Sequence, residues 1–220
     1  MCSLASNAAN AAVANPCVAG SPLVDQARLP STTTSTKAAD GTTIGTVTTA
    51  GSLTESRGTY IVNGAGAAGI GPAAGDAFRW VRQSFTGDGE IIAKISSLQN
   101  TGSSSRVGVM IRDSLAANSK EIFMGMTGSN AYRWVRRTTT GGSTSSSNSS
   151  TGTVPNTWVR LVRAGTTITA YKSTNGTSWT SVGSTNNTTF ATTCYIGLAV
   201  SSGSNTTLNT SQLSSVTVTP

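Results

Sequence analysis

The sequence predicts an all-β protein, a two-sheet antiparallel β-sandwich, and three observations support this fold class. About a dozen short runs alternate apolar with polar residues and are separated by Gly, Asn, Ser and Thr, which is typical of half-buried strands joined by turns. The 32 Ser and 37 Thr among 220 residues suit strands and turns and disfavour helices. No helical pattern alternates with the strand-like runs, so we do not expect a parallel sheet of βαβ units.

The N-terminal 22 residues differ from the rest of the chain. They are rich in Ala and Asn, and Ser3 or Ser6 could cap a short helix that ends at Pro16. An arm of this size cannot fold alone, so we expect residues 1–22 to dock onto another surface and residues 23–220 to form the sandwich. The first 20 residues lack the basic start and apolar core of a secretory signal, and no run is long enough to span a membrane.

The strand-like runs follow one another along the remaining chain. They cover residues 43–49, 59–63, 77–85, 90–98, 106–112, 121–127, 131–139, 157–163, 166–172, 177–182, 193–201 and 212–219. Asn175-Gly176 predicts a type I′ hairpin turn, because that turn needs two positive φ angles. Ala164-Gly165 and Gly87-Asp88-Gly89 indicate further turns. The sequence "DSLAANSKE" predicts a short helical turn near 114–119, and the apolar-poor segment 141–153 predicts a mobile surface loop.

Several blocks of sequence stand in a familiar order. They are "GDGEIIAKI", "RVGVMIRDSLAANS", "IFMGMT", "RWVRRTTTGG", "TWVRLVRAGTTITAYKSTNGTSWTSVGS" and "CYIGLAVSS". This order resembles a bacterial concanavalin A-like lectin/glucanase module over roughly residues 55–219. The resemblance implies a jelly-roll sandwich. It leaves the function open, because that superfamily includes lectins, glucanases and structural modules.

Composition narrows the chemistry that the chain can perform. With no His and eight acidic residues, it has no Ser-His-Asp triad, no imidazole zinc site and few carboxylates for a metal cage, so we expect no metal and no cofactor. The net charge of +7, with 11 of 15 cations being Arg, favours anionic partners such as an acidic polysaccharide or surface polymer. A charged fraction of 10% without a Lys/Arg run argues against nucleic acid.

The glycines at Gly64–Gly69, "GAGAAG", match the dinucleotide-binding pattern GxGxxG. That chemistry needs a helix to begin there, but Gly and Pro follow instead. We therefore expect a loop with unusual backbone angles rather than a nucleotide site.

Glucanases of the resembling fold carry two catalytic carboxylates on one strand, as Glu-x-Asp-x-Glu or a close variant. This chain offers only Asp88-x-Glu90, in a Gly-rich turn, and the separate acids Asp76, Asp113 and Glu121. From this we expect no catalytic residues and no enzymatic activity.

The cysteines Cys2, Cys17 and Cys194 are odd in number. In one interpretation Cys2 and Cys17 pair within the arm and Cys194 is a buried thiol. In the other, one cysteine bridges to a second chain or ties the arm to the sandwich.

Three segments share Trp-Val-Arg with a Gly five residues after the Arg, at 80–82, 134–136 and 158–160. On a strand, the Trp and the Arg share one face and the Val points to the other. An aromatic and cationic platform of this kind suits an extended glycan. The candidate ligand-binding residues are therefore Trp80, Arg82, Trp134, Arg136, Trp158 and Arg160. The alternative is that the Trp residues belong to the core and the Arg residues stack on them.

Two functions follow. The first is a non-catalytic, extracellular or cell-surface module that binds glycans or mediates adhesion through an exposed sheet face. The second is a structural subunit of an extracellular filament or sheath, or of a virion as a decoration or tail protein, that self-assembles through the N-terminal arm.

Overall fold

The computed structural model describes residues 40–67, 69–71, 75–186 and 188–220, and there it confirms the antiparallel β-sandwich. The arm 1–22, with Cys2 and Cys17, lies outside the described residues, so the domain division and arm-mediated assembly remain expectations. The described part contains no helix, and so none with the length and apolar character needed to cross a membrane.

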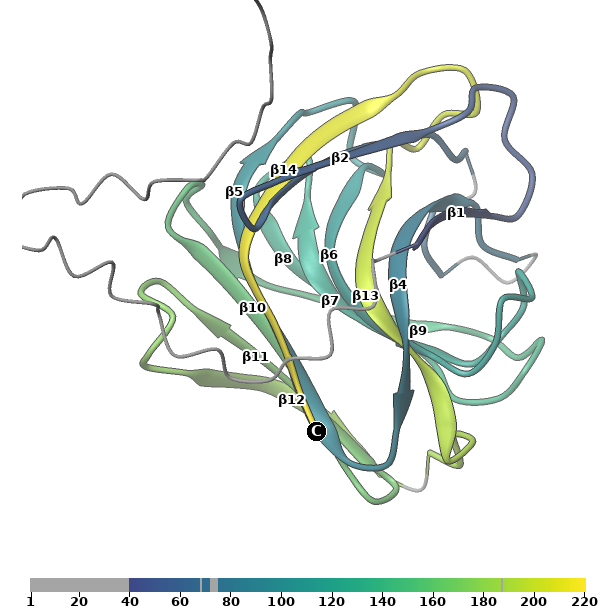
Figure 1. Cartoon of the computed structure of the whole chain (residues 1–220), viewed down its shortest axis with the longest axis vertical. Helices are drawn as coiled ribbons and strands as arrows, with labels where there is room; N and C mark the ends of the chain where they lie inside the picture. The colour runs from purple at the N-terminus through teal and green to yellow at the C-terminus, as the bar shows by residue number, and fades with distance from the viewer. Residues whose placement is uncertain (1–39, 68, 72–74, 187) are drawn as a thin grey trace, which may run out of the picture. The chain divides into compact units, whose positions relative to one another are not determined.

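Two sheets of seven strands make up the described sandwich, and every pairing is antiparallel (Figure 1). Sheet A contains, in spatial order, β1 (Asp40–Ile44), β4 (Phe78–Thr86), β13 (Thr193–Ser201), β6 (Arg106–Arg112), β7 (Glu121–Thr127), β8 (Ala131–Arg137) and β9 (Ser145–Thr151). Sheet B contains β12 (Thr180–Thr185), β11 (Thr167–Ser173), β10 (Thr157–Ala164), β5 (Gly89–Leu98), β14 (Asn209–Thr219), β3 (Thr59–Gly64) and β2 (Ser52–Ser56).

The main core lies between the sheets and follows from alternation along each strand. Val81 of β4, Val109 of β6 and Met124 of β7 point inward from sheet A to meet Ile91 and Leu161 of sheet B. Burying such side chains stabilises the sandwich by roughly 1.5–3 kcal/mol each. Because side chains alternate along a strand, the neighbouring residues of the same strands face away from this core.

A second apolar cluster covers the outer face of sheet A. Phe78 and Trp80 of β4, Met110 of β6 and Phe123 of β7 pack there against Ile70 of the loop that follows β3. This loop contains the "GAGAAG" segment, and Gly66 and Gly69 have φ angles of 143° and 66°, which confirms the expected unusual backbone angles. This loop therefore covers part of the outer face of sheet A.

Each predicted strand overlaps an observed one, but four local predictions were wrong. Strands β2 and β9 were not predicted, and β9 lies inside the segment 141–153 that we expected to be a mobile loop. The expected helical turn near 114–119 is a non-helical turn, in which Ser119 N donates to Ala116 O and the Ser119 hydroxyl accepts a hydrogen bond from Ser114 N.

The fourth correction concerns the hairpin between β11 and β12. The connection spans 174–179, and only Gly176 has a positive φ, of 77°, so the turn is not type I′. The Asn175 side chain stabilises the turn instead. Its Oδ1 accepts hydrogen bonds from Thr177 N and Ser178 N at 3.0 and 2.9 Å.

Candidate functional site

The three Trp-Val-Arg segments occupy three different surfaces of the sandwich. In each, the Trp and the Arg share one face and the Val points to the other, as the strand period requires. The segment in β4 faces outward from sheet A, the one in β8 faces the core, and the one in β10 faces outward from sheet B. The six candidate residues therefore do not form one platform.

Trp80 and Arg82 lie on the outer face of sheet A. Trp80 is fully buried in the outer apolar cluster, edge-on to Phe78 and Tyr195. The Arg82 guanidinium lies over the Tyr195 ring, 4.9 Å from its centroid. Because Trp80 is covered, it presents no ring face to a ligand.

Trp134 and Arg136 lie on the inner side of sheet A. Trp134 is 4% exposed and packs across the sandwich against Gly183 of β12. The Arg136 guanidinium stacks on the indole, 3.9 Å from its centroid. This pair matches the alternative interpretation, in which the Trp belongs to the core and the Arg covers its edge.

Trp158 and Arg160 lie on the outer face of sheet B, and both are partly exposed. Two further aromatic residues join them, since the Arg160 guanidinium is 5.2 Å from the Tyr171 ring centroid and 5.6 Å from that of Trp179. Arg160 Nε also donates to Glu90 Oε2 at 2.8 Å. We call Trp158, Arg160, Tyr171 and Trp179 the sheet B patch.

The sheet B patch is an open face rather than a pocket. A cavity of about 50 Å³ between the sheets is lined by residues such as Val81, Leu198 and Val218, and it has room for water but not for a sugar ring. Asp88 accepts a hydrogen bond from Gly165 N at 2.7 Å, so it fastens the hairpin that Ala164-Gly165 makes.

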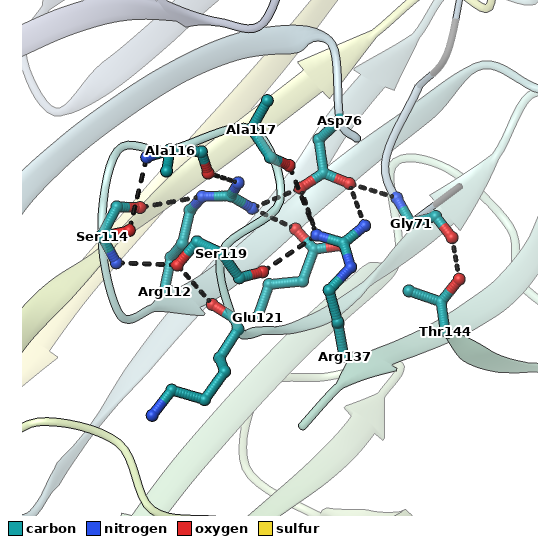
Figure 2. Close-up of polar contacts among 11 residues, drawn as sticks. Gly71, Asp76, Arg112, Ser114, Ala116, Ala117, Ser119, Glu121, Arg137 and Thr144 are labelled. Carbon is teal, nitrogen blue, oxygen red and sulfur yellow. Dashed lines mark hydrogen bonds and ion pairs between the residues drawn. The ribbon is translucent and has the colours of Figure 1, made fainter. Parts of the chain in front are cut away.

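A buried ionic network is the second notable arrangement (Figure 2). Arg112 Nη1 contacts Asp76 Oδ2 at 2.6 Å and Glu121 Oε2 at 2.5 Å. Arg137 contacts the other side of Asp76, with Nη2 2.7 Å from Oδ1. All four side chains are fully buried on the outer side of sheet A.

The network fastens two loops to sheet A. Asp76 Oδ1 accepts a hydrogen bond from Gly71 N at 2.9 Å, which ties the segment after β3 to the arginines. Arg112 donates to Ser114 O and Ala116 O, and Arg137 donates to Ser119 O, so both arginines also hold the turn between β6 and β7 (Figure 2).

The two carboxyl groups of the network titrate in opposite directions. Burial raises the pKa of Glu121 to about 8, and the neighbouring Asp76 carboxylate adds to the rise while Arg112 and Arg137 oppose it. Burial also acts to raise the pKa of Asp76, but the hydrogen bond from Arg137 and the charge of Arg112 outweigh it, and the net pKa is lowered. With a pKa of about 8, the Glu121 carboxyl group therefore carries a proton near neutral pH, beside the Asp76 anion.

From the sequence we expected Asp76 and Glu121 to be separate acids, and we did not single out Tyr171 or Trp179 as site residues. Arg112 and Glu121 stand opposite each other in the β6–β7 hairpin, a pairing that the short connection could have indicated. Nothing in the sequence places Asp76, which is 36 residues from Arg112.

Cys194 is a buried free thiol of β13, with Arg163 Nη1 3.4 Å from its Sγ. Burial raises the pKa of this thiol, and Arg163 opposes the rise. Of the two cysteine interpretations, a buried thiol describes Cys194, and Cys2 and Cys17 lie outside the described residues.

The fold is shared with solved structures at low sequence identity. A functionally unknown protein from Saccharomyces cerevisiae matches with a TM-score of 0.62 at 12% identity, over 81% of this chain and 95% of that one. A prokaryotic β-1,3-1,4-glucanase (lichenase) from a mouse hindgut metagenome matches with a TM-score of 0.51 at 11% identity, over 76% and 81%. A mutant of the GH43 protein BlXynB from Bacillus licheniformis matches at 0.51 and 10%, over 74% and 37%. No family model matches the chain, and no curated protein matches it in sequence.

These matches confirm the concanavalin A-like sandwich, and they correct the expectation that the chain is not an enzyme. That expectation rested on the missing Glu-x-Asp-x-Glu pattern. A solved glucanase has the same sandwich fold, so the fold of this chain is one that enzymes use.

Proposed function

We propose that this protein binds polysaccharide on the outer face of sheet B, through the sheet B patch. The observation that carries the proposal is the gathering of Tyr171 and Trp179 around the Arg160 guanidinium, with Trp158 two residues before Arg160 on the same face of β10; all three aromatic residues are partly exposed. Buried aromatic residues need no ligand, but partly exposed rings grouped on one open face present apolar surface that a partner can cover.

The chemistry of the patch fits a sugar chain. An aromatic ring offers an apolar face to the C–H side of a pyranose, while Arg160 and Glu90 together offer donors and acceptors to its hydroxyl groups. Arg160 Nε and Nη2 donate to Glu90, and Nη1 makes no hydrogen bond with any described residue. Because the face is open, the ligand is an extended chain rather than an enclosed monosaccharide. A polysaccharide partner of this kind supports the proposal that the protein acts outside the cell or on its surface.

The test is a binding assay with neutral polysaccharides, beginning with β-1,3-1,4-glucan, by affinity electrophoresis and calorimetry. Trp158→Ala and Tyr171→Ala are each expected to weaken binding at least tenfold, on the order of 1.4 kcal/mol, because each removes a stacking surface. Thermal unfolding of each variant establishes that the sandwich is intact.

Tyr195→Ala is the matched control. It removes another partly exposed tyrosine that lies beneath a guanidinium, that of Arg82, but on the outer face of sheet A. It should leave polysaccharide affinity unchanged. An equal loss in Tyr195→Ala and Tyr171→Ala, or no polysaccharide binding by the intact protein, would refute the proposal.

Glycoside hydrolysis is a second candidate function, because two carboxyl groups with opposite pKa shifts contact one arginine. Both carboxyl groups are fully buried and out of reach of a substrate at the surface, so polysaccharide binding is the better supported of the two functions. The assay is the release of reducing ends from β-1,3-1,4-glucan. Release that is lost in Glu121→Gln would establish this activity, and the absence of release from the intact protein would remove it.

A further inference from the structure

The outer face of sheet A carries more positive than negative charge. Two acids of this face, Asp76 and Glu121, contact Arg112 and Arg137, and a third, Asp40 of β1, stands opposite Arg82 in the β1–β4 pairing. The other arginines of this face, Arg82, Arg106 and Arg133, form no ion pair with any described carboxylate. Elsewhere in the described part Asp113 pairs with Lys120 and Glu90 with Arg160. Three arginines of this one face are therefore without a carboxylate partner among the described residues.

Arg106 and Arg133 are neighbours across strand β7. Arg106 of β6 stands opposite Thr127 of β7, and Arg133 of β8 stands opposite Gly125. Two strand spacings and a register offset of two residues separate the two Cα positions by roughly 12 Å, a distance that two long side chains can close around one small group. Neither Gly125 nor Thr127 brings a charge between them.

Arg106 has no partner in the described part of the chain. It is partly buried, its Nε is buried without a hydrogen bond, and no other hydrogen bond or ion pair involves it. Burial and the like charge of Arg133 lower the pKa of Arg106, and the more distant Glu121 and Asp76 oppose this. A guanidinium in this position lacks the anion that would stabilise it.

Arg133 is held but not neutralised. Its Nη1 donates to Asn148 Oδ1 at 2.8 Å and its Nη2 to Ser146 Oγ at 2.5 Å, both on β9. Both acceptors are uncharged, and Arg133 Nε is buried without a hydrogen bond. Strand β9 therefore fixes the direction of a guanidinium that keeps its full charge.

Ser201 supplies a third polar group on the same face. It stands opposite Arg106 in the β13–β6 pairing, is fully buried, and its hydroxyl makes no hydrogen bond. A buried hydroxyl without a partner costs free energy, and such a group in a native structure calls for an explanation. A bound group next to Arg106 would provide the missing acceptor.

We propose that Arg106, Arg133 and Ser201 bind one oxyanion, either a free ion or the sulfate or carboxylate group of an acidic polysaccharide. Guanidinium groups donate in a fork that matches the oxygens of such groups, and the partly buried position strengthens the contact relative to open solvent. This site is separate from the sheet B patch and does not depend on it.

The test titrates the intact protein with inorganic sulfate, with a sulfated oligosaccharide and with an oligouronate, by calorimetry at low ionic strength. Arg106→Gln and Arg133→Gln are each expected to lower the affinity at least tenfold, and Ser201→Ala about tenfold. Arg57→Gln is the matched control, because it removes one positive charge from the exposed β2–β3 turn. It should change the affinity less than twofold.

Binding of inorganic sulfate that needs Arg106 would identify a free ion as a sufficient ligand, whereas binding only of the sugars would assign the site to an anionic sugar. The absence of all binding, or an equal loss in Arg57→Gln and Arg106→Gln, would overturn the proposal. Titration of the Tyr171→Ala protein separates the two faces, since a failed sheet B patch leaves this oxyanion affinity intact.

Discussion

At the scale of single residues, Asp76 and Glu121 of the ionic network have similar carboxyl groups but different protonation states. Asp76 accepts hydrogen bonds from Arg112, from Arg137 and from Gly71 N, so its anion holds three segments together. Glu121 has only part of that support, and burial favours its protonated form. The network therefore contains one anion that must stay charged and one carboxyl group that resists ionisation.

This difference predicts a pH dependence of stability. The ordinary pKa of Glu121 is 4.5 and its folded pKa is about 8, so within this window the folded state keeps a proton that the unfolded state has released. The free energy of unfolding then falls as pH rises from about 5 to 8. Asp76, with its lowered pKa, contributes no slope there. Glu121→Gln mimics the protonated acid. In this variant the free energy of unfolding, measured in urea at pH 5, 6, 7 and 8, should fall clearly less steeply with pH.

Asp76→Asn provides the contrast to that substitution. It removes the anion from two buried guanidinium groups, so it should destabilise the protein at every pH in the same series, by about 3–5 kcal/mol. An unchanged slope in Glu121→Gln, or an Asp76→Asn protein as stable as the original, would contradict this account of the network.

The sequence can predict contacts between residues of two strands joined by a short turn, but not contacts between residues far apart in the chain. Once Gly165 ends β10, the tight hairpin places Arg160 opposite Tyr171, so this half of the sheet B patch follows from counting along the two strands. Asp76 and Arg137 are 61 residues apart, and no local pattern brings them together. The network depends on long-range topology, which explains why it was missed.

At the scale of elements, β9 is a strand that the alternation of apolar and polar residues does not predict. Its sequence "SSSNSST" has no apolar residue, because β9 is an edge strand whose side chains are mostly exposed on both faces. Its only strand neighbour is β8, so backbone hydrogen bonds rather than burial hold it in the sheet. The twelve predicted strands all had apolar positions to indicate them.

The contact between β8 and β12 carries a prediction at this scale. A Cβ on Gly183 would lie 2.6 and 2.8 Å from the Trp134 ring atoms Cη2 and Cε3. Because Trp134 is confined by the core, Gly183→Ala should force the two strands apart and cost about 1–3 kcal/mol in the free energy of unfolding, measured in urea.

Ser181→Ala is the control on the same strand. Ser181 is exposed, so its substitution should change the stability by less than about 0.5 kcal/mol. A Gly183→Ala protein that is as stable as Ser181→Ala would mean that Trp134 has room to move, and the close packing of β12 on β8 would not hold.

At the scale of the whole molecule, the two outer faces of the sandwich differ in kind. Sheet B presents aromatic rings around an arginine that Glu90 neutralises. Sheet A presents Arg82, Arg106 and Arg133, which form no ion pair with a described carboxylate. Part of the net charge of +7, which the sequence shows only as a total, therefore lies on the outer face of sheet A.

The two faces should therefore respond differently to salt. Exposed charges separated by more than about 10 Å are largely screened at 0.1 M ionic strength, and added ions also compete for a guanidinium pair, whereas stacking on aromatic rings involves no net charge. Raising NaCl from 50 to 500 mM should weaken sulfate binding at least tenfold and change the affinity for neutral β-1,3-1,4-glucan less than twofold. Both affinities are measured by calorimetry on the same preparation. Arg106→Gln should remove sulfate binding only, and Trp158→Ala should weaken glucan binding only. If salt weakens both affinities in parallel, or if Arg106→Gln weakens glucan binding as much as Trp158→Ala does, the ligands share one surface and the assignment of two separate faces fails.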